Sequence, residues 1–419
     1  MTLTKKIACL GLILCLFHLS TQAQDNILLQ NATIIEGTSQ KAPYKGSVWI
    51  ENGKIKKVFR KTAKTPNGTT VIDCTGKYIT PGLIESHVHL ATIDLSDMAS
   101  ARSKTDKILE NMVRHGITTL RDMAGDAPFL ARYQQESETG AKIAPAIFYA
   151  AQFAGPSYFK MFESGSRKKM GIHPWERAIT DTTDIKKAVR EAKDAGVTGI
   201  KTYAQLSLHQ MEEITKEARK IGLQVWSHAT IYPIKPSDAA NQSVNSLSHA
   251  ADILFEQLPK DSVDLSYAWK KVYEGMKPDR DALSPLFHQM KKKGIFFDPT
   301  VFHATNNKLY YAVDILKWAH QAGVKIVAGT DWIYPETNEM VPLYDEAKIY
   351  VEKAGFSPLQ TIETLTYNGA SVIGLKDRGR IQKGKRADIL ILDTDPLQDI
   401  QALFTPQTVI KQGKVVFKK

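Results

Sequence analysis

The two ends of the chain share one pattern of apolar and polar residues, and the middle has another. Near the ends, short runs alternate apolar with polar residues, which is the period of a β-strand with one buried face. The strands predicted in this way are 26–35, 46–50, 54–59, 70–73, 387–392 and 408–417. A turn at Gln412-Gly413 divides the last run, so the pattern predicts small antiparallel sheets at both ends.

In the middle of the chain, strand-like runs alternate with helix-like ones. Amphipathic stretches such as 184–195 and 208–221 predict helices between the strands. The eight predicted strands are 83–89, 117–122, 145–151, 196–203, 223–228, 244–249, 294–298 and 324–331. Because strands that alternate with helices form parallel sheets, we predict an α/β fold. It is a (β/α)8 TIM-type barrel inserted into a small β-sandwich domain formed by both termini.

This organisation divides the chain into four parts. The predicted parts are a leader at 1–23, the N-terminal part of the sandwich at 24–79, the barrel at 80–376 and the C-terminal part of the sandwich at 377–419. Two connections are long, 152–183 after the third barrel strand and 250–293 after the sixth. Long connections in a compact domain are typical of lids and binding loops.

The first 23 residues have the composition of a secretory signal peptide. Lys5 and Lys6 precede an apolar run at 7–19, and small residues up to Ala23 suit cleavage. The alternative is a membrane anchor, but the apolar run is too short to span a bilayer comfortably. We therefore predict an exported protein, periplasmic or secreted, with no stable membrane span after the leader is removed. Cys74 is then the only cysteine left, so no intramolecular disulfide can form.

Composition narrows the partners only a little. With 419 residues, of which 43% are hydrophobic, the chain can bury a large core. The net charge is +11, or +9 after Lys5 and Lys6 are subtracted, which can favour anionic ligands or envelope surfaces. The basic residues are scattered and no nucleic-acid-binding motif is present, so we predict a small-molecule substrate and no nucleic acid. A homo-oligomer remains open.

A pair of histidines gives the first chemical signal. His87 and His89 are two residues apart in the first barrel strand, so both side chains point to the same side. Two converging imidazoles suit a divalent transition metal. In isolation, the pair could equally be two ordinary barrel histidines.

Four further polar residues lie at or near the ends of other predicted strands. Lys201 is near the end of the fourth, His228 ends the fifth, His249 ends the sixth and Asp331 ends the eighth. In a TIM barrel these ends meet on one face, where active sites form. A buried His, Asp or Lys is costly without a partner, and a metal centre provides a partner for each. The sequence therefore predicts a metal centre at the mouth of the barrel.

Each of these residues has a predicted role. His87 and His89 bind one metal, His228 and His249 bind the second, and Asp331 is both a ligand of the first metal and the proton shuttle. Lys201 can ligate only if its amine takes up carbon dioxide to form a carbamate, which would bridge the two metals. The alternative is that Lys201 extends towards the rim as an ordinary charged lysine.

The same residues resemble the amidohydrolase superfamily. Within it, the chain is similar to the imidazolonepropionase-related branch, which includes metal-dependent dipeptidases of the Xaa-Pro and Xaa-Arg kind. Besides the ligand set, the similar segments are Gly-Ile-Thr-Thr-Leu-Arg-Asp-Met at 116–123, Thr-Tyr-Asn-Gly-Ala-Ser-Val-Ile-Gly-Leu at 366–375 and the return into the sheet domain at 379–393. The resemblance runs from about Asn26 to the C-terminus.

The resemblance implies a mechanism and cofactors. A hydroxide activated by divalent metals, two zinc ions by default, attacks the carbonyl carbon of an amide C–N bond. Asp331 accepts the proton and returns it to the leaving amine. Lys201 is expected as the carbamate. The substrate class is a dipeptide or an N-acyl amino acid, which makes the chain an exported metal-dependent amidohydrolase.

Two segments depart from the related dipeptidases, and both are expected to border the pocket. They are 151–160 after the third strand and Trp-Ile-Tyr-Pro at 332–335, so the substrate is expected to be unusual, bulky or aromatic. Tyr203, Arg121 and His303 are candidate substrate contacts. Tyr203 could instead be a packed rim residue, and Arg121 could instead pair with a neighbour such as Asp122.

Two other functions stay open on the sequence. One is a mononuclear cyclic amidohydrolase or deaminase of the imidazolonepropionase type, which needs one metal and no essential Lys201. The other is a barrel kept as a binding or structural protein, although such proteins usually lose ligands and this chain has all of them.

Overall fold

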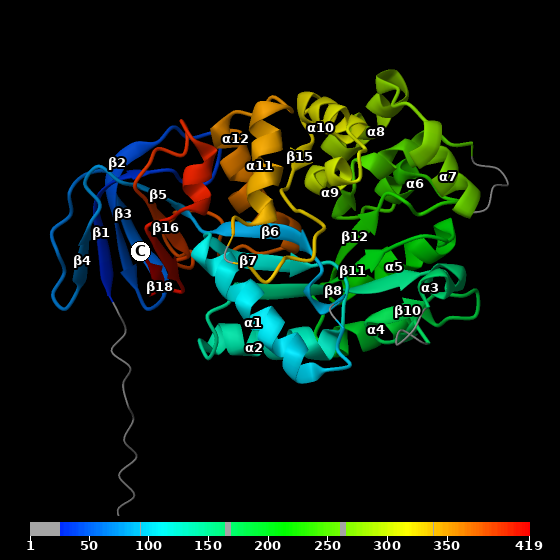
Figure 1. Ribbon diagram of the computed structural model, residues 1–419, viewed down its shortest axis with the longest axis horizontal. Helices are drawn as coiled ribbons and strands as arrows, with labels where there is room; N and C mark the ends of the chain where they lie inside the picture. Colours follow the sequence, from blue (N-terminus) through cyan, green and yellow to red (C-terminus); the bar gives the residue numbers. More distant parts are fainter. Residues whose placement is uncertain (1–25, 93, 164–168, 260–264, 338) are drawn as a thin grey trace, which may run out of the picture.

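A computed structural model describes residues 26–419, with the exception of 93, 164–168, 260–264 and 338. The predicted leader at 1–23 lies outside the described residues. Two bodies lie side by side in Figure 1: a sheet domain at one end and a larger α/β body that makes up the rest. Along the described part of the chain, no helix combines the length and the apolar character needed to cross a bilayer.

Strands from both termini form the sheet domain. They are β1 (Ile27–Ile34), β2 (Tyr44–Glu51), β3 (Lys54–Phe59), β4 (Thr70–Asp73), β5 (Tyr78–Pro81), β16 (Ile389–Leu392), β17 (Thr408–Lys411) and β18 (Lys414–Lys418). Their order is β18-β17-β16-β5-β1-β2-β3, and β4 also pairs with β1. The antiparallel pairing of β16 with β5 joins the two ends of the chain, so blue and red strands meet in Figure 1. Apolar side chains of this sheet form a core of their own.

Eight parallel strands form the barrel. They are β6 (Leu83–Val88), β7 (Ile117–Asp122), β8 (Ala146–Ala154), β11 (Gly199–Thr202), β12 (Gln224–His228), β13 (Ser246–Ser248), β14 (Phe296–Asp298) and β15 (Lys325–Ile326). Each pairs with the next in parallel, from β6 to β15. Backbone hydrogen bonds from Ser86 to Ala328 and from Thr330 to His87 close the circle. The predicted (β/α)8 barrel with a sheet domain from both termini is confirmed.

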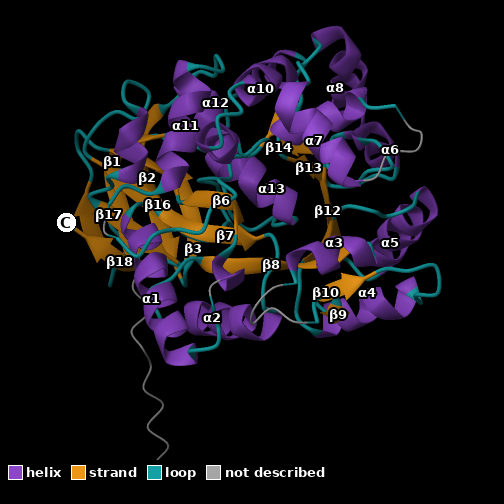
Figure 2. Ribbon diagram, turned by 45° about the vertical axis from the view of Figure 1, so that its right-hand side comes forward, coloured by secondary structure: helices purple, strands orange, loops and turns teal. Residues whose placement is uncertain are grey.

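Helices surround the barrel, as Figure 2 shows. The longer ones are α1 (Met98–Arg114), α2 (Ala127–Thr139), α4 (Ile185–Asp194), α5 (Leu208–Lys220), α7 (Leu265–Gly275), α8 (Arg280–Lys293), α10 (Tyr311–Gln321) and α11 (Pro342–Glu352). The shorter ones are α3 (Pro156–Phe162), α6 (Pro236–Asn241), α9 (Val301–Asn306), α12 (Pro358–Glu363) and α13 (Gly369–Ile373). Short 3₁₀ helices are η1 (Leu90–Thr92), η2 (Ala251–Gln257) and η4 (Ile400–Phe404), and η3 (Thr364–Asn368) is a π-helix. Local sequence fixes their ends: Ser207 and Gln210 form a capping box at the start of α5, and Gly294 ends α8 in the left-handed conformation.

The two long connections contain regular structure. After β8, the chain forms α3 and then a hairpin of β9 (Ile172–His173) and β10 (Glu176–Ala178), and β10 extends the barrel sheet by pairing with β8. After β13, it forms η2, α7 and α8. The eighth strand is much shorter than the predicted 324–331, because the chain beyond Ile326 turns towards the barrel mouth and Asp331 adopts a left-handed backbone with φ of 53°.

Candidate metal centre

The six residues predicted as metal ligands lie together at the C-terminal ends of the barrel strands. His87 lies in β6 and His89 directly after it, Lys201 lies in β11, and His228 ends β12. His249 follows β13, and Asp331 lies beyond β15. The barrel therefore brings together side chains that are up to 244 residues apart in sequence (331 minus 87). We call the surface formed by these six residues, together with Thr300 beside His249, the floor of the site.

His87, His89 and Asp331 form the tightest cluster. Asp331 Oδ1 lies 3.2 Å from His87 Nε2 and 3.0 Å from His89 Nε2. Nδ1 of His87 lies 2.7 Å from a carboxylate oxygen of Asp298, and Nδ1 of His89 lies 3.1 Å from the carbonyl oxygen of Ala124. Both of those oxygens accept, so each Nδ1 carries a proton and each Nε2 is the ring nitrogen left to face Asp331 and a metal.

This arrangement suits a cation. Two imidazole Nε2 atoms and one carboxylate oxygen converge, and their ligand atoms all lie within 4.8 Å of one another. Two imidazole nitrogens and a carboxylate are a donor set that a divalent ion takes, with loss of any proton on Nε2. The residues present therefore fit a metal at this position.

His228, His249 and Lys201 lie beside this cluster. The rings of His228 and His249 are 4.1 Å apart, and the ring of His249 is 4.9 Å from that of His87. Nδ1 of His249 lies 2.9 Å from Thr300 Oγ1, while its buried Nε2 has no hydrogen-bond partner among the described residues. Burial holds the pKa of both His228 and His249 well below its ordinary value, which favours the neutral imidazole that metal ligation requires.

Lys201 is buried next to the histidines. Its Nζ lies 3.5 Å from His87 Nε2, and its side chain is almost fully enclosed. Burial lowers the pKa of this amine, which favours the neutral, nucleophilic form that a carbamate requires. The surroundings of Lys201 are unlike those of a lysine that extends to the rim.

His228 is oriented differently from the other histidines. The backbone N–H of Thr230 donates to its Nδ1 at 2.9 Å, and its Nε2 lies 3.5 Å from Asp252 Oδ2. The lone pair of Nδ1 is thus occupied in this orientation. His228 can ligate a metal only when its imidazole turns.

The backbone is strained at three points of this floor. His249, Thr300 and Asp331 have φ values of 75°, 45° and 53°, a region that residues with a side chain seldom adopt. Each such residue costs on the order of 1–3 kcal/mol and persists only where the surroundings enforce it. Hydrogen bonds to neighbouring strands do so here: His249 N–H donates to Asp298 O, and Asp331 N–H donates to His87 O.

A layer of buried polar groups supports the ligands from below. Asp298, at the end of β14, accepts from His87 Nδ1, from Arg121 Nη2 at 2.8 Å and from Ser248 Oγ at 3.2 Å. Glu85 accepts from the backbone of His87 and from the backbone and hydroxyl of Thr330. Neither Asp298 nor Glu85 was predicted from the sequence, although Asp298 ends a predicted strand, as several of the predicted metal ligands do.

Arg121 belongs to this supporting layer. Its side chain is fully buried, pairs with Asp298 and lies over the ring of Trp226. It does not line the pocket, so this placement argues against the predicted contact with a substrate carboxylate. The alternative pairing with Asp122 is also wrong, because the partner is Asp298.

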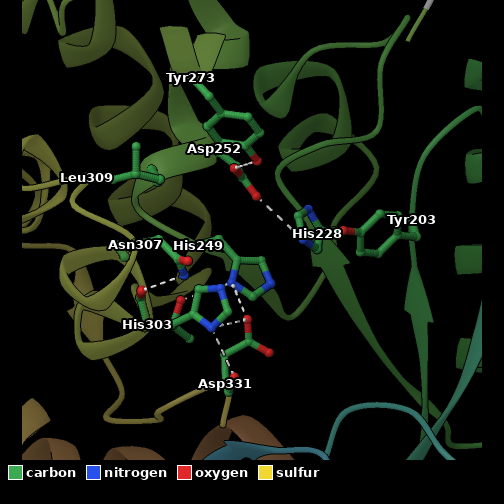
Figure 3. Close-up of a pocket in the computed structure, with 12 residues that line it drawn as sticks. Tyr203, His228, His249, Asp252, Tyr273, His303, Asn307, Leu309 and Asp331 are labelled. Atoms are coloured by element: carbon green, nitrogen blue, oxygen red, sulfur yellow. Dashed lines mark hydrogen bonds and ion pairs between the residues drawn. The ribbon is translucent and has the colours of Figure 1, made fainter. Parts of the chain in front are cut away.

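A pocket of about 480 Å³ opens above the floor, and Figure 3 shows the residues around it. Its lining consists of Tyr203, His228, His249, Ala251, Asp252, Tyr273, Thr300, His303, Ala304, Asn307, Leu309 and Asp331. Two of the predicted substrate contacts, Tyr203 and His303, are therefore at the pocket. Asp252, Tyr273, Asn307 and Leu309 were not predicted, because they come from connections that carry no strand-end pattern.

The two segments that depart from the related dipeptidases lie behind these pocket residues. The ring of Tyr158 lies 4.4 Å from that of Tyr203, and the ring of Trp332 lies 5.8 Å from that of His303. Neither Tyr158 nor Trp332 lines the pocket among the described residues. They act on its shape through the residues that they support.

Comparison with known proteins decides the family. The model of the Amidohydrolase family matches residues 78–416. The chain belongs to the amidohydrolase family. Its relatives in this family are hydrolases that act on C–N bonds, so this amidohydrolase is an enzyme rather than a barrel kept only for binding.

Relatives and solved structures agree with this assignment. Ochratoxinase from Aspergillus niger is 25% identical over 402 residues, covering 81% of this chain and 75% of that protein. Imidazolonepropionase from Treponema denticola is 23% identical over 451 residues, covering 93% and 96%. The crystal structure of a Xaa-Pro dipeptidase with bound methionine shares the fold, with a TM-score of 0.76, 19% identity and coverage of 94% of this chain and 100% of that one. The resemblance to the amidohydrolase superfamily is thereby confirmed.

Proposed function

We propose that this amidohydrolase hydrolyses the amide C–N bond of a dipeptide or an N-acyl amino acid at a centre of two divalent metal ions, with zinc as the default. His87, His89 and Asp331 hold one ion, His228 and His249 hold the other, and Lys201, as a carbamate, is shared between them. The observation that carries the proposal is the convergence of two imidazole Nε2 atoms on one carboxylate oxygen of Asp331. Membership of the amidohydrolase family supports the reaction type, and a structure with the same fold is named a Xaa-Pro dipeptidase.

Metal ions bound here would supply a polarised water and a Lewis acid for the carbonyl oxygen. The protein itself holds the ligand side chains in fixed orientations. Asp298 fixes the proton of His87 on Nδ1, and Ala124 O does the same for His89, so neither ring has to choose a tautomer when a ligand arrives. Burial favours the neutral amine of Lys201, which can add carbon dioxide and release one proton to give a carbamate anion that binds metals.

Asp331 is the group that accepts and returns the proton. Its side chain is about 15% exposed and lines the pocket, so one carboxylate can face both the floor and the substrate. Oδ1 lies against His87 and His89, and Oδ2 lies 3.6 Å from both His249 and His303. An oxygen in that place can accept a proton from water as general base and return it to the leaving nitrogen as general acid.

A second candidate is a mononuclear cyclic amidohydrolase or deaminase. One observation favours it: Nδ1 of His228 accepts the Thr230 N–H, so among the described residues it is the cluster of His87, His89 and Asp331 whose ligand atoms already converge on one point. The imidazolonepropionase relative carries a name that fits a cyclic substrate. This candidate predicts one metal per chain and little effect of Lys201→Ala.

Export is a further part of the proposal, and it rests on the sequence of residues 1–23 alone. The test is N-terminal sequencing of the protein recovered outside the cytoplasm, where a start at residue 24 supports cleavage. The domain bounds 24–79, 80–376 and 377–419 are likewise kept as a proposal.

The test of the function is amine release by the purified mature protein from a panel of dipeptides and N-acyl amino acids, with Asp331→Asn as the blank. We expect metal-dependent release from some members and a loss of roughly 10²–10⁴-fold in the variant, the size of a general acid–base contribution. Circular dichroism of the variant should match the wild type. Release that is unchanged in Asp331→Asn would remove Asp331 from the mechanism, and release from cyclic amides alone would favour the second candidate.

A further inference from the structure

Asp252 lies on the wall of the pocket opposite Asp331. It belongs to η2, a part of the connection after β13, and Figure 3 shows it between Tyr273 and His228 with its carboxyl group directed towards the histidines. Its side chain is about 7% exposed, and the residue lines the cavity. The pocket therefore has an acidic group at each end.

The carboxylate of Asp252 has no lysine or arginine partner among the described residues. Of these residues, only His228 comes within ion-pair distance of it, at 3.5 Å. Of the described residues that line the pocket, none is a lysine or an arginine. A nearly buried carboxylate without a cation is costly, and a cationic ligand would relieve that cost.

Tyr273 holds the carboxylate in place. Its hydroxyl donates to Oδ1 of Asp252, while Oδ2 is the oxygen nearer to His228. Tyr273 itself is about 40% exposed and comes from α7, so it covers Asp252 from the outer side of the pocket. The hydrogen bond from Tyr273 therefore fixes the orientation of the Asp252 carboxylate, with Oδ2 directed towards His228.

We propose that Asp252 binds a cationic nitrogen of the substrate, namely the α-ammonium group on the acyl side of the scissile bond. The inference rests on the proposed amide hydrolysis and narrows it: the substrates are aminoacyl amides and dipeptides with an unblocked amino group, and N-acyl amino acids are poor substrates. An α-nitrogen is only two bonds from the carbonyl carbon. A carbonyl that reacts above His228 and His249 therefore brings that nitrogen to the Asp252 side of the pocket.

A competing reading gives Asp252 a positioning role only, with its effect passing through the imidazole of His228. The two readings differ in what they predict for ligands of different charge. A recognition role discriminates an ammonium group from a neutral group of the same size. A positioning role weakens every ligand alike and lowers the metal content.

The experiment compares the binding of two small ligands that contain no amide bond. L-leucinol carries an ammonium group, and the corresponding diol, 4-methylpentane-1,2-diol, has a hydroxyl in its place; the leucine side chain suits the apolar contact that Leu309 offers. Calorimetry at pH 8 measures both ligands on the metal-loaded full chain, on Asp252→Asn and on Tyr273→Phe. Asn keeps an oxygen for the Tyr273 hydroxyl, so the first variant changes charge rather than shape.

We expect the wild type to bind leucinol at least tenfold more tightly than the diol. Asp252→Asn should lose this preference while binding of the diol changes less than twofold, and Tyr273→Phe should keep part of it. Equal binding of both ligands to the wild type overturns the proposal, as does an equal loss for both ligands in Asp252→Asn. If the preference holds but no amide is hydrolysed by the wild type, the proposed function fails and the cation site stands.

Discussion

The floor of the pocket and its outer wall are built from different parts of the chain. The floor consists of residues at strand ends, such as His87 and Asp331, and its members are buried or nearly so and are held by neighbouring strands. The wall consists of residues from connections, such as Tyr273 in α7 and Leu309 after α9, and it is partly exposed. The barrel thus fixes the chemistry, and the connections are left to select the substrate.

The difference extends to the backbone. The floor contains three non-glycine residues with a left-handed backbone, His249, Thr300 and Asp331. Backbone hydrogen bonds to the barrel strands offset the conformational strain of His249 and Asp331. Floor residues should therefore tolerate no substitution without loss of metal or activity. Wall residues should change the preference for substrates and leave the metal in place.

The strongest test of the floor is Lys201→Ala. Because this variant removes the group shared by both metals, we expect a loss of metal and a fall of more than about 100-fold in activity, a bound taken from the effect of outer-shell ligand partners. The measurement is elemental analysis of the purified protein together with amine release. Lys187→Ala, at an exposed position of α4, is the matched control. A full metal complement in Lys201→Ala would contradict the carbamate.

A weaker effect is expected one layer below the floor. Asp298→Asn removes the carboxylate that holds His87 in its tautomer and pairs with Arg121, so metal affinity should fall by about 10–100-fold. Competition with a chromogenic chelator measures this affinity. Asp314→Asn, on the exposed face of α10, should leave it unchanged. Equal affinities for wild type and Asp298→Asn would show that the supporting layer is not needed.

On the wall, Leu309→Ala should act on the substrate alone. Loss of about two or three buried methylene contacts corresponds to roughly 2 kcal/mol, or up to about 30-fold in KM. Metal content and kcat should stay within about twofold of the wild type, because Leu309 lies in the pocket lining but not in the ligand cluster. Steady-state kinetics on the best substrate of the panel decides this, and a loss of metal would erase the distinction between floor and wall.

The smallest effect on activity is expected at a buried charge outside both regions. Lys411 is buried between the sheet domain and α2, where its Nζ donates to the backbone carbonyl and hydroxyl of Ser137, and burial lowers its pKa to about 8. The unfolded chain, with a lysine pKa near 10.4, binds more protons between these values, so wild-type stability rises with pH from about 8 to about 10.4.

Lys411→Met should lack this rise. Between pH 8 and pH 10.4, the free energy of unfolding of the wild type should therefore rise by up to about 3 kcal/mol relative to that of the variant. Urea denaturation at pH 7 and pH 10 measures the shift, with amine release at pH 7 unchanged. If Lys411→Met lost activity, then replacing any buried charge would impair the enzyme, and activity would not depend on the floor residues in particular.

The floor could be predicted from the sequence because its signal is local. A polar residue at the end of an apolar strand, as at His228 or His249, marks the barrel mouth as soon as the strands are counted. The same rule applied to Asp298 would have found the supporting carboxylate. Arg121 was assigned to the substrate because the sequence does not show that its partner is 177 residues away.

The wall could not be predicted in the same way. Asp252 and Tyr273 meet through the folding of one long connection, and nothing in their spacing of 21 residues indicates a hydrogen bond. The eighth strand was predicted, but its end was not: β15 ends at Ile326 rather than at 331, because an apolar run does not show where regular pairing stops and the chain turns into the site. Tertiary packing, rather than local pattern, sets both features.

The central claim is that the converging side chains of the floor are a metal centre that hydrolyses a C–N bond. The most direct measurement is a titration of metal-stripped wild-type protein with Zn²⁺, with amine release followed at each addition. We expect no release without metal and full release at two equivalents per chain. Full release by the metal-stripped protein would contradict the account, and saturation at one equivalent would replace it with the mononuclear alternative.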